Sequence, residues 1–270
     1  DRWKLGERPN AIAEESAQKP LEDIQLPPVE DKNLPPVQRL RLHYTKRGLL
    51  KFLSHLDLIR VLNMIMSRAG VPVAFTQGFH PQPRLQYSPP LSLGFESDDD
   101  VADVYLVREM STEDLLRTLN ECTINDLEFT SCEPVSLGSE SVEESIVASE
   151  FEVIVNPELL GASEMTQSVC ENLVERFMSG APMPIKISKK NRVLERDARE
   201  GLLEFRLGPK DESGIRFEMK IAQESGRYIN PLDLLGGLFG RPLCLGDDLE
   251  VRRTRVILAA QTTSASLAKA

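Results

Sequence analysis

The strongest constraint on the fold is an order of predicted elements that occurs twice along this chain of 270 residues. From residue 38 to residue 135, hydrophobic periodicity and turn residues predict strand, helix, strand, strand, helix and strand. From residue 148 to residue 260 this order recurs, with one extra strand and a basic segment from Lys186 to Arg199. Helices and strands that follow one another in this way bury their apolar faces in two packed layers. We therefore predict an α+β fold of two ferredoxin-like (βαββαβ-type) halves with antiparallel sheets.

Local signals set the bounds of these elements. Between Arg39 and Tyr44, leucines alternate with cations, as in a half-buried strand. Ser54 begins a helix that Gly70 ends. The other predicted elements of the first half are an extended piece at 49–53, strands at 71–75, 85–87, 102–107 and 127–134, and a helix at 111–120. In the second half we predict strands at 150–155, 183–187, 202–207, 215–221 and 249–258, and helices at 162–179 and 231–239.

Three segments lie outside the two halves. Residues 1–37 contain six prolines among many charges, which predicts a linker. A start of this kind is expected where a C-terminal domain joins a larger polypeptide, and also in a processed organellar protein. Residues 136–147 are expected to form a connector, and residues 261–270 a disordered tail.

Charge is sorted along the sequence. The segment from Gln38 to Tyr87 holds eight Lys or Arg residues against Asp57 as its only acid, although the chain has a net charge of −10. The same segment holds all three histidines and five Phe or Tyr rings. The following segment, Ser88 to Glu150, holds sixteen acids against two arginines. Cations interleaved with rings predict contacts with phosphates and bases. The alternative is that the two segments neutralise each other within the fold.

The first candidate for chemistry is the segment from Ser54 to Asp57. In one interpretation His55 and Asp57 face a substrate beside the basic strand. In the other, Ser54 and Asp57 only cap the helix, since an acid in the first turn is favoured by the helix dipole. A Ser/His/Asp hydrolase triad is disfavoured, because residues this close at one helix start do not align as nucleophile, base and orienting acid.

The second candidate is the loop from Gln77 to Arg84. Gly78 permits a positive φ, and two prolines stiffen the segment that follows. Phe79, His80 and Arg84 would then be presented for stacking on a base and pairing with a phosphate. The alternative is that Phe79 fills the core and the prolines only protect an edge strand.

Several classes of site are not indicated. No apolar run approaches the roughly 18 residues that a membrane span requires. The four cysteines are far apart and do not predict a zinc site or an iron–sulfur cluster. The three histidines lack helical spacing and a nearby carboxylate cluster, so no metal is expected in this chain. There is no phosphate loop or dinucleotide-binding fingerprint.

Taken together, several short motifs between residues 38 and 135 resemble the bacterial radical-SAM-linked domain of unknown function. The resemblance rests on Phe52-Leu53-Ser54-His55-Leu56-Asp57-Leu58, Arg68-Ala69-Gly70, Pro72-Val73-Ala74, Gln77-Gly78-Phe79-His80-Pro81, Pro83-Arg84 and Leu91-Ser92-Leu93-Gly94. The second half matches only in its general pattern.

The resemblance implies a domain that occurs alone or as the C-terminal part of cobalamin-binding-type radical SAM proteins. It implies a radical SAM enzyme as partner, in cis or in trans. The iron–sulfur cluster and S-adenosylmethionine would belong to that partner or to a preceding domain, because this chain lacks the three-cysteine motif. Genes of the family are often associated with ribosomal-protein and ribonuclease genes, which implies ribosomal or transfer RNA as a further partner.

The leading hypothesis is a non-catalytic recognition domain that binds RNA, or an RNA-associated substrate, for this enzyme in the cytoplasm or the plastid stroma. The residues expected to bind are Arg39, Arg41, Lys51, His55, Asp57, Arg60, Gln77, Gly78, Phe79, His80 and Arg84. One alternative is a metal-independent endoribonuclease that uses His55 or His80 as general acid or base, with Arg84 or Lys51 stabilising the phosphorane. Another is a protein–protein docking scaffold.

Overall fold

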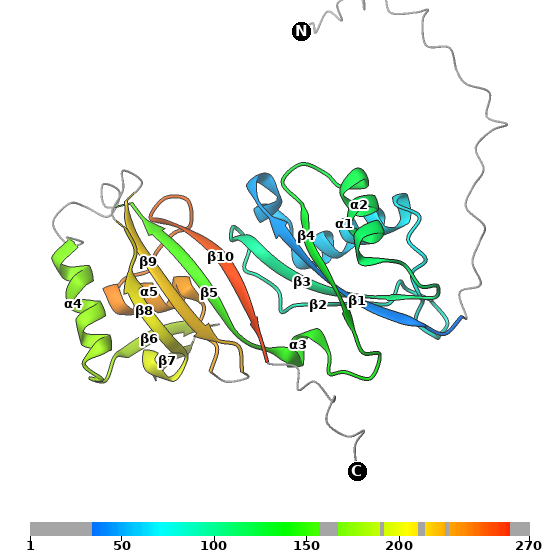
Figure 1. Cartoon of the computed structure of the whole chain (residues 1–270). Coiled ribbons are helices and arrows are strands. Elements are labelled where there is room, and N and C mark those ends of the chain that lie inside the picture. The colour runs from blue at the N-terminus through cyan, green and yellow to red at the C-terminus, as the bar shows by residue number, and fades with distance from the viewer. Residues whose placement is uncertain (1–33, 157–166, 190–191, 210–213, 225–226, 260–270) are drawn as a thin grey trace, which may run out of the picture. The chain divides into compact units, whose positions relative to one another are not determined.

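The computed structural model describes residues 34–156, 167–189, 192–209, 214–224 and 227–259 (Figure 1). The predicted linker and tail therefore lie outside the described residues, apart from residues 34–37 of the linker. Within the described ranges no helix combines the length and the apolar character that crossing a membrane requires.

The first half contains five of the predicted elements close to their expected bounds. Its elements are β1 (Gln38–Lys46), the 3-10 helix η2 (Gly48–Phe52), α1 (His55–Arg68), β2 (Leu85–Tyr87), β3 (Glu96–Leu106), α2 (Thr112–Cys122) and β4 (Phe129–Val135). Two predictions are wrong. The segment 49–53 is not extended, because Gly48 at φ +55° turns the chain and the bond from Leu50 N to Arg47 O closes a tight turn. The segment 71–75 forms only an isolated bridge between Val73 and β3 and another between Phe75 and Pro83.

The second half also follows the predicted order. Its elements are α3 (Val142–Ser145), β5 (Ile146–Val155), α4 (Gln167–Met178), β6 (Pro184–Lys189), β7 (Arg192–Asp197), the 3-10 helix η3 (Ala198–Glu200), β8 (Leu202–Leu207), β9 (Ile215–Ala222), α5 (Pro231–Phe239) and β10 (Leu249–Leu258). Most of the basic segment from Lys186 to Arg199 falls in the β6–β7 hairpin. The bounds predicted for α5 and β10 agree with the structure at both ends.

The predicted α+β class is confirmed, and one sheet runs through both halves. Its strand order is β4-β1-β3-β10-β5-β9-β8, with β2 also paired to β3. All of these pairs are antiparallel except β10 with β3, whose parallel register aligns Arg252 with Glu96 and Arg253 with Ser97. This short pairing joins the halves, and the sequence did not predict it. The ferredoxin-like description of each half stays a prediction.

Each half has its own hydrophobic core between the sheet and its helices. In the first half, Leu42 and Val104 of the sheet pack with Leu62 of α1 and Leu119 of α2. In the second half, the core extends from Phe151 and Phe217 of the sheet to α4, α5 and the β6–β7 hairpin.

Candidate functional site

Two of the predicted binding residues, Arg39 and Arg41, are buried inside the protein. Each is 1% exposed, so the prediction of a half-buried strand with its cations in solvent is wrong. Both guanidiniums bind the carboxylate of Asp103 on β3, which is itself fully buried. Arg39 Nε donates to Asp103 Oδ2 at 2.9 Å, and Arg41 Nε donates to Oδ1 at 2.8 Å. These arginines are therefore part of the structure and not of a surface that meets phosphate.

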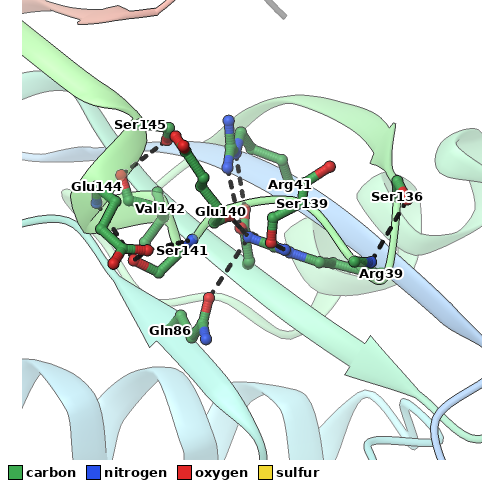
Figure 2. Close-up of polar contacts among 12 residues, drawn as sticks. Arg39, Arg41, Gln86, Ser136, Ser139, Glu140, Ser141, Val142, Glu144 and Ser145 are labelled. Carbon is green, nitrogen blue, oxygen red and sulfur yellow. Dashed lines mark hydrogen bonds and ion pairs between the residues drawn. The ribbon is translucent and has the colours of Figure 1, made fainter. Parts of the chain in front are cut away.

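The Arg39 side chain also fixes the connector between the two halves. Its Nη1 donates to Ser139 O at 2.8 Å, its Nη2 to Glu140 O at 2.7 Å, and Nη2 lies 3.4 Å from Gln86 Oε1 (Figure 2). Beyond these contacts, a capping box between Ser141 and Glu144 starts α3. The arginine thus holds the chain between β4 and β5 against the sheet.

Arg47, Lys51 and His43 of the basic segment also pair with acids of the next segment. His43 Nδ1 lies 2.6 Å from Asp99 Oδ1, Arg47 Nε 2.8 Å from Asp98 Oδ1, and Lys51 Nζ 3.7 Å from Glu96 Oε1. The antiparallel register of β1 with β3 brings the two segments together. Internal neutralisation, the alternative that the sequence left open, accounts for much of the sorted charge.

The start of α1 follows the capping interpretation. The Ser54 side chain accepts a hydrogen bond from Asp57 N, and Arg60 Nη1 lies 2.6 Å from Asp57 Oδ1. The Ser54 hydroxyl also donates to Asp57 Oδ2 at 2.6 Å, and this hydrogen bond and the one from Arg60 lower the pKa of the Asp57 carboxyl. Asp57 and Arg60 therefore serve the helix end. The Ser54 side chain also caps the helix. His55 is not part of this cap and lines a small cavity described below.

The loop from Gln77 to Arg84 presents Phe79 to solvent. Phe79 is 96% exposed, and its ring meets His80 edge to face, with the ring centroids 5.2 Å apart. The alternative in which Phe79 fills the core is wrong. Gly78 has φ +148°, a conformation that favours glycine, and no atom lies within 4 Å of the position a Cβ would take. The glycine is thus required by the backbone and not by crowding. At the other end of the loop, the Arg84 guanidinium lies 4.2 Å from the centroid of the Tyr105 ring.

A second group of polar side chains, which the sequence did not single out, lies beneath the start of α1. It consists of Tyr44 and Lys46 of β1, Asp100 of β3 and Arg253 of β10, each nearly inaccessible to solvent. Arg253 forms an ion pair with Asp100. His55 lines the same small cavity as Tyr44, Lys46 and Asp100, and its ring meets Tyr87 edge to face. The residues come from opposite ends of the sequence, so no local motif could have indicated them.

Burial controls the titration of this group. Burial, together with the neighbouring charge of Arg253, lowers the pKa of the Lys46 ammonium to about 8. Burial and the charge of Lys46 lower the pKa of His55, which is therefore neutral at neutral pH. Burial raises the pKa of the Tyr44 hydroxyl, so this group stays protonated. Such perturbed values in a cavity are typical of functional sites, although structural ion pairs also produce them.

A larger groove adjoins this cavity. It has a volume of about 770 Å³, and Arg253, which is buried, is the cation that lines it. Pro89 and Leu91 line both the groove and the small cavity, so this segment is their common wall. The size falls in the range of about 300–1,000 Å³ that is typical of small-molecule sites.

The cysteines do not fit an iron–sulfur cluster. Cys122 and Cys132 lie in the first half, and Cys170 and Cys244 in the second. Among the described residues no three His, Cys, Asp or Glu side chains gather as a metal site would require. No chemistry through a cluster is therefore assigned to these residues.

The fold and the site define an α+β domain with a large, mostly antiparallel sheet and a buried polar pocket where its two halves join. The chain belongs to the family described as "Uncharacterized protein conserved in bacteria (DUF2344)", which matches residues 39–231. This membership agrees with the expected domain of unknown function, and the link to radical SAM proteins stays a prediction. No curated protein matches the chain.

Solved structures give only distant similarities. One is titled "Crystal Structure of a Cbf5-Nop10-Gar1 Complex", with a TM-score of 0.40 and 10% identity over 80% of this chain and 48% of that chain. Another is titled "Crystal structure of the archaeal box H/ACA sRNP Nop10-Cbf5 complex", with a TM-score of 0.39 and 12% identity over 83% of this chain and 51% of that chain. The present chain spans about half the length of these chains. Similarity of this degree carries no information about function.

Proposed function

We propose that this chain is a recognition domain that binds RNA, or an RNA-associated substrate, for a radical SAM enzyme in the cytoplasm or the plastid stroma. The observation that supports it best is the exposure of Phe79 on a loop that the backbone holds in place. Thr76 N donates to Gln82 O at 2.8 Å, and Arg84 N donates to Ala74 O at 2.7 Å. An exposed aromatic ring costs little entropy to immobilise when its loop is already fixed, which favours stacking on an unpaired base.

The binding we expect is local and not spread over a basic surface. Arg39 and Arg41 are buried, and Lys51 and Arg60 pair with acids. Of the predicted cations, Arg84 is the one beside the Phe79 loop, where its guanidinium stacks on Tyr105. If single-stranded RNA releases about one or two condensed counterions on binding, a plot of the logarithm of the binding constant against the logarithm of the salt concentration has a slope of about −1. A surface that used all eight cations of the segment would give a slope of about −5 to −6.

The test is a titration of fluorescent single-stranded RNA with the full chain over a salt series. Phe79→Ala should weaken binding by about tenfold, because stacking of one base is worth about 1–3 kcal/mol. Phe52→Ala is the matched control, since Phe52 is also a largely exposed phenylalanine but lies on η2. Equal affinity of Phe79→Ala and the unchanged chain would contradict the proposed contact, and a slope near −5 would contradict its local character.

A second candidate, the docking scaffold, is favoured by exposed apolar side chains near the start of α1. Leu49, Phe52, Leu56 and Leu93 are all more than half exposed, and Gly94 N donates to Lys51 O, which places Leu93 beside η2. Apolar groups that gather on a surface are typical of protein interfaces. If the radical SAM partner docks here, Phe52→Ala should weaken binding to the purified partner while RNA binding is unchanged. Weaker RNA binding by Phe52→Ala with unchanged binding to the partner would contradict the scaffold candidate.

The ribonuclease alternative has less support from the geometry. His55 faces a cavity of about 10 Å³, which is room for about one water molecule and not for a scissile phosphate. His80 is exposed, and its described contact is with the Phe79 ring. RNA cleavage that persists in EDTA and disappears in His55→Ala or His80→Ala would reverse this assessment.

A further inference from the structure

The large sheet has β4 as its end strand on one side and β8 on the other (Figure 1). The free edge of β4 is closed, because Asn120 Nδ2 donates to Phe129 O at 2.8 Å and Phe129 N donates to Asn120 Oδ1 at 2.9 Å. Pro134 of the same strand has no N–H group to offer. Proteins protect edge strands in such ways because unpaired backbone groups bind other strands.

The edge of β8 lacks this protection within the described ranges. In an antiparallel ladder, every second residue bonds to the neighbouring strand. Gly208 N donates to Arg216 O of β9 at 2.9 Å, so the backbone groups of Phe205 and Leu207 point away from β9. None of the hydrogen bonds described for the chain uses these outward groups, and β8 contains no proline. A further strand therefore has donors and acceptors to pair with here.

The side chains of β8 are complementary to a second copy of the same strand. Residues 203–207 are Leu-Glu-Phe-Arg-Leu, a sequence that alternates apolar, acidic, apolar, basic and apolar side chains. If two copies run antiparallel with Phe205 opposite Phe205, Glu204 lies opposite Arg206 at both crossings, and leucine lies opposite leucine. Glu204 and Arg206 share one face of the sheet, and both side chains are more than half exposed. Opposite charges that face each other across two strands stabilise the pairing.

The charges already present on this face fit the same arrangement. Within the chain, Lys220 Nζ lies 3.3 Å from Glu204 Oε1, and Arg206 Nε lies 2.6 Å from Glu218 Oε2. The row of side chains that crosses between the two copies would contain Lys220 and Glu204 of one copy, followed by Arg206 and Glu218 of the other. Positive and negative charges alternate along this row, so pairing of the copies brings no like charges together.

We propose that the chain forms a homodimer in which the β8 strands of two copies pair antiparallel about Phe205. Phe205 N of each copy donates to Phe205 O of the other. The register shift between Leu202 and Glu204 is a bulge that ends the regular pairing, so the interface is short. An interface of this size gives a dissociation constant on the order of 10 µM. Because the β4 edge is closed, the large sheet does not add a third copy.

The experiment is analytical ultracentrifugation of the full chain from about 1 µM to about 500 µM, a range that brackets the expected constant. Glu204→Arg and Arg206→Glu should each weaken self-association by at least about tenfold, because each places like charges opposite one another at both crossings. An equimolar mixture of these two variants should recover the dimer, since both crossings then join opposite charges. The ion pairs within each chain are disturbed equally alone and in the mixture, so recovery reports the contact between copies.

Three controls accompany these variants. Glu121→Arg makes the same change of charge as Glu204→Arg but on the exposed face of α2, and it should dimerise like the unchanged chain. Phe79→Ala should also dimerise normally, because the interface is independent of the proposed RNA contact. Leu207→Pro removes an outward N–H without a change of charge, and it should weaken the dimer while the ladder to β9 is kept.

Three results would overturn the inference. A monomer over the whole concentration range would mean that copies of the chain do not pair through β8. A dimer that Glu204→Arg, Arg206→Glu and Leu207→Pro all leave unchanged would place the interface elsewhere. A mixture of the two charge variants that stays monomeric, although circular dichroism shows both to be folded, would contradict the antiparallel register about Phe205.

Discussion

The substitution Asp103→Asn tests whether the buried arginine cluster holds the first half together. Asp103 accepts hydrogen bonds from Nε and Nη2 of both Arg39 and Arg41, and all three side chains are buried. Arg39 would keep its contacts to Ser139 O and Glu140 O. Arg41, whose described acceptors are the two oxygens of Asp103, would lose one of them and face an amide NH2 donor in its place, with no carboxylate to balance its charge. Asparagine has almost the same volume, so the loss is one of charge and hydrogen bonding and not of packing.

The expected cost is about 3–5 kcal/mol of the free energy of unfolding, as for other buried pairs that lose one partner. The assay is urea denaturation followed by fluorescence and circular dichroism, with the midpoint compared at constant slope. Asp114→Asn is the matched control, because Asp114 pairs with Arg117 on the exposed face of α2, and its substitution should change the urea midpoint much less. A second variant, Arg41→Met in the Asp103→Asn background, should recover part of the loss, since it removes the uncompensated charge.

A loss of less than about 1 kcal/mol in Asp103→Asn would refute this reasoning, because it would mean that water or another acceptor reaches Arg41. Absence of any recovery in the double variant would likewise show that Arg41 is not the group left unpaired. In either case Arg39 and Arg41 would again become candidates for ligand contacts.

Three further predictions concern stability. At pH 7, Lys46→Met should stabilise the chain by about 2 kcal/mol after allowance for solvent screening. Because the folded pKa of Lys46 is about 8 and the ordinary value is 10.5, the unfolded chain binds more protons at this group between these values. The stability advantage of Lys46→Met over the unchanged chain should therefore shrink as the pH rises from 8 to 10.5, and urea midpoints of both chains from pH 7 to 11 test this. Ser141→Ala should lower the free energy of unfolding by about 1 kcal/mol through loss of the α3 cap, and a thermal shift that does not fall would contradict it. Gly48→Ala should cost about 1–2 kcal/mol, since Gly48 has φ +55° and a Cβ there would approach Asp126 Oδ2, whereas Gly138→Ala, which meets no atom within 4 Å, should be neutral.

Local features of the sequence were sufficient for most elements. The helix after Ser54 and the helix after Ser111 begin where a capping serine precedes an apolar face, and both serines accept the expected hydrogen bond. The bounds of α5 follow from Asn230 and Pro231 at its start and Gly240 at its end. The exposure of Phe79 was one of two open interpretations, and Gly78 was the signal for it.

The sequence shows that charge is sorted along the chain. Whether the cations lie at the surface or inside the protein depends on how the strands pair. Arg39 and Arg41 alternate with leucines as cations of a half-buried strand do, and nothing in their spacing shows that the connector to the second half covers the outer face. The register of β1 with β3 places Arg41 opposite Asp103. A cation of one strand is buried in an ion pair when an acid of a neighbouring strand lies opposite it. The alternation of residues within a single strand does not show which distant residue lies opposite.

The sequence by itself therefore determined the α+β class, the order of the elements and the local caps, because these depend on interactions between residues a few positions apart. Only the tertiary structure decided that the two halves share one sheet through β3 and β10, and that Lys46, Asp100 and Arg253 meet beside a groove. More than 150 positions separate Arg253 from Asp100. Side chains so far apart are brought together by the packing of whole elements, and the burial that lowers the pKa of Lys46 exists only once that packing is complete.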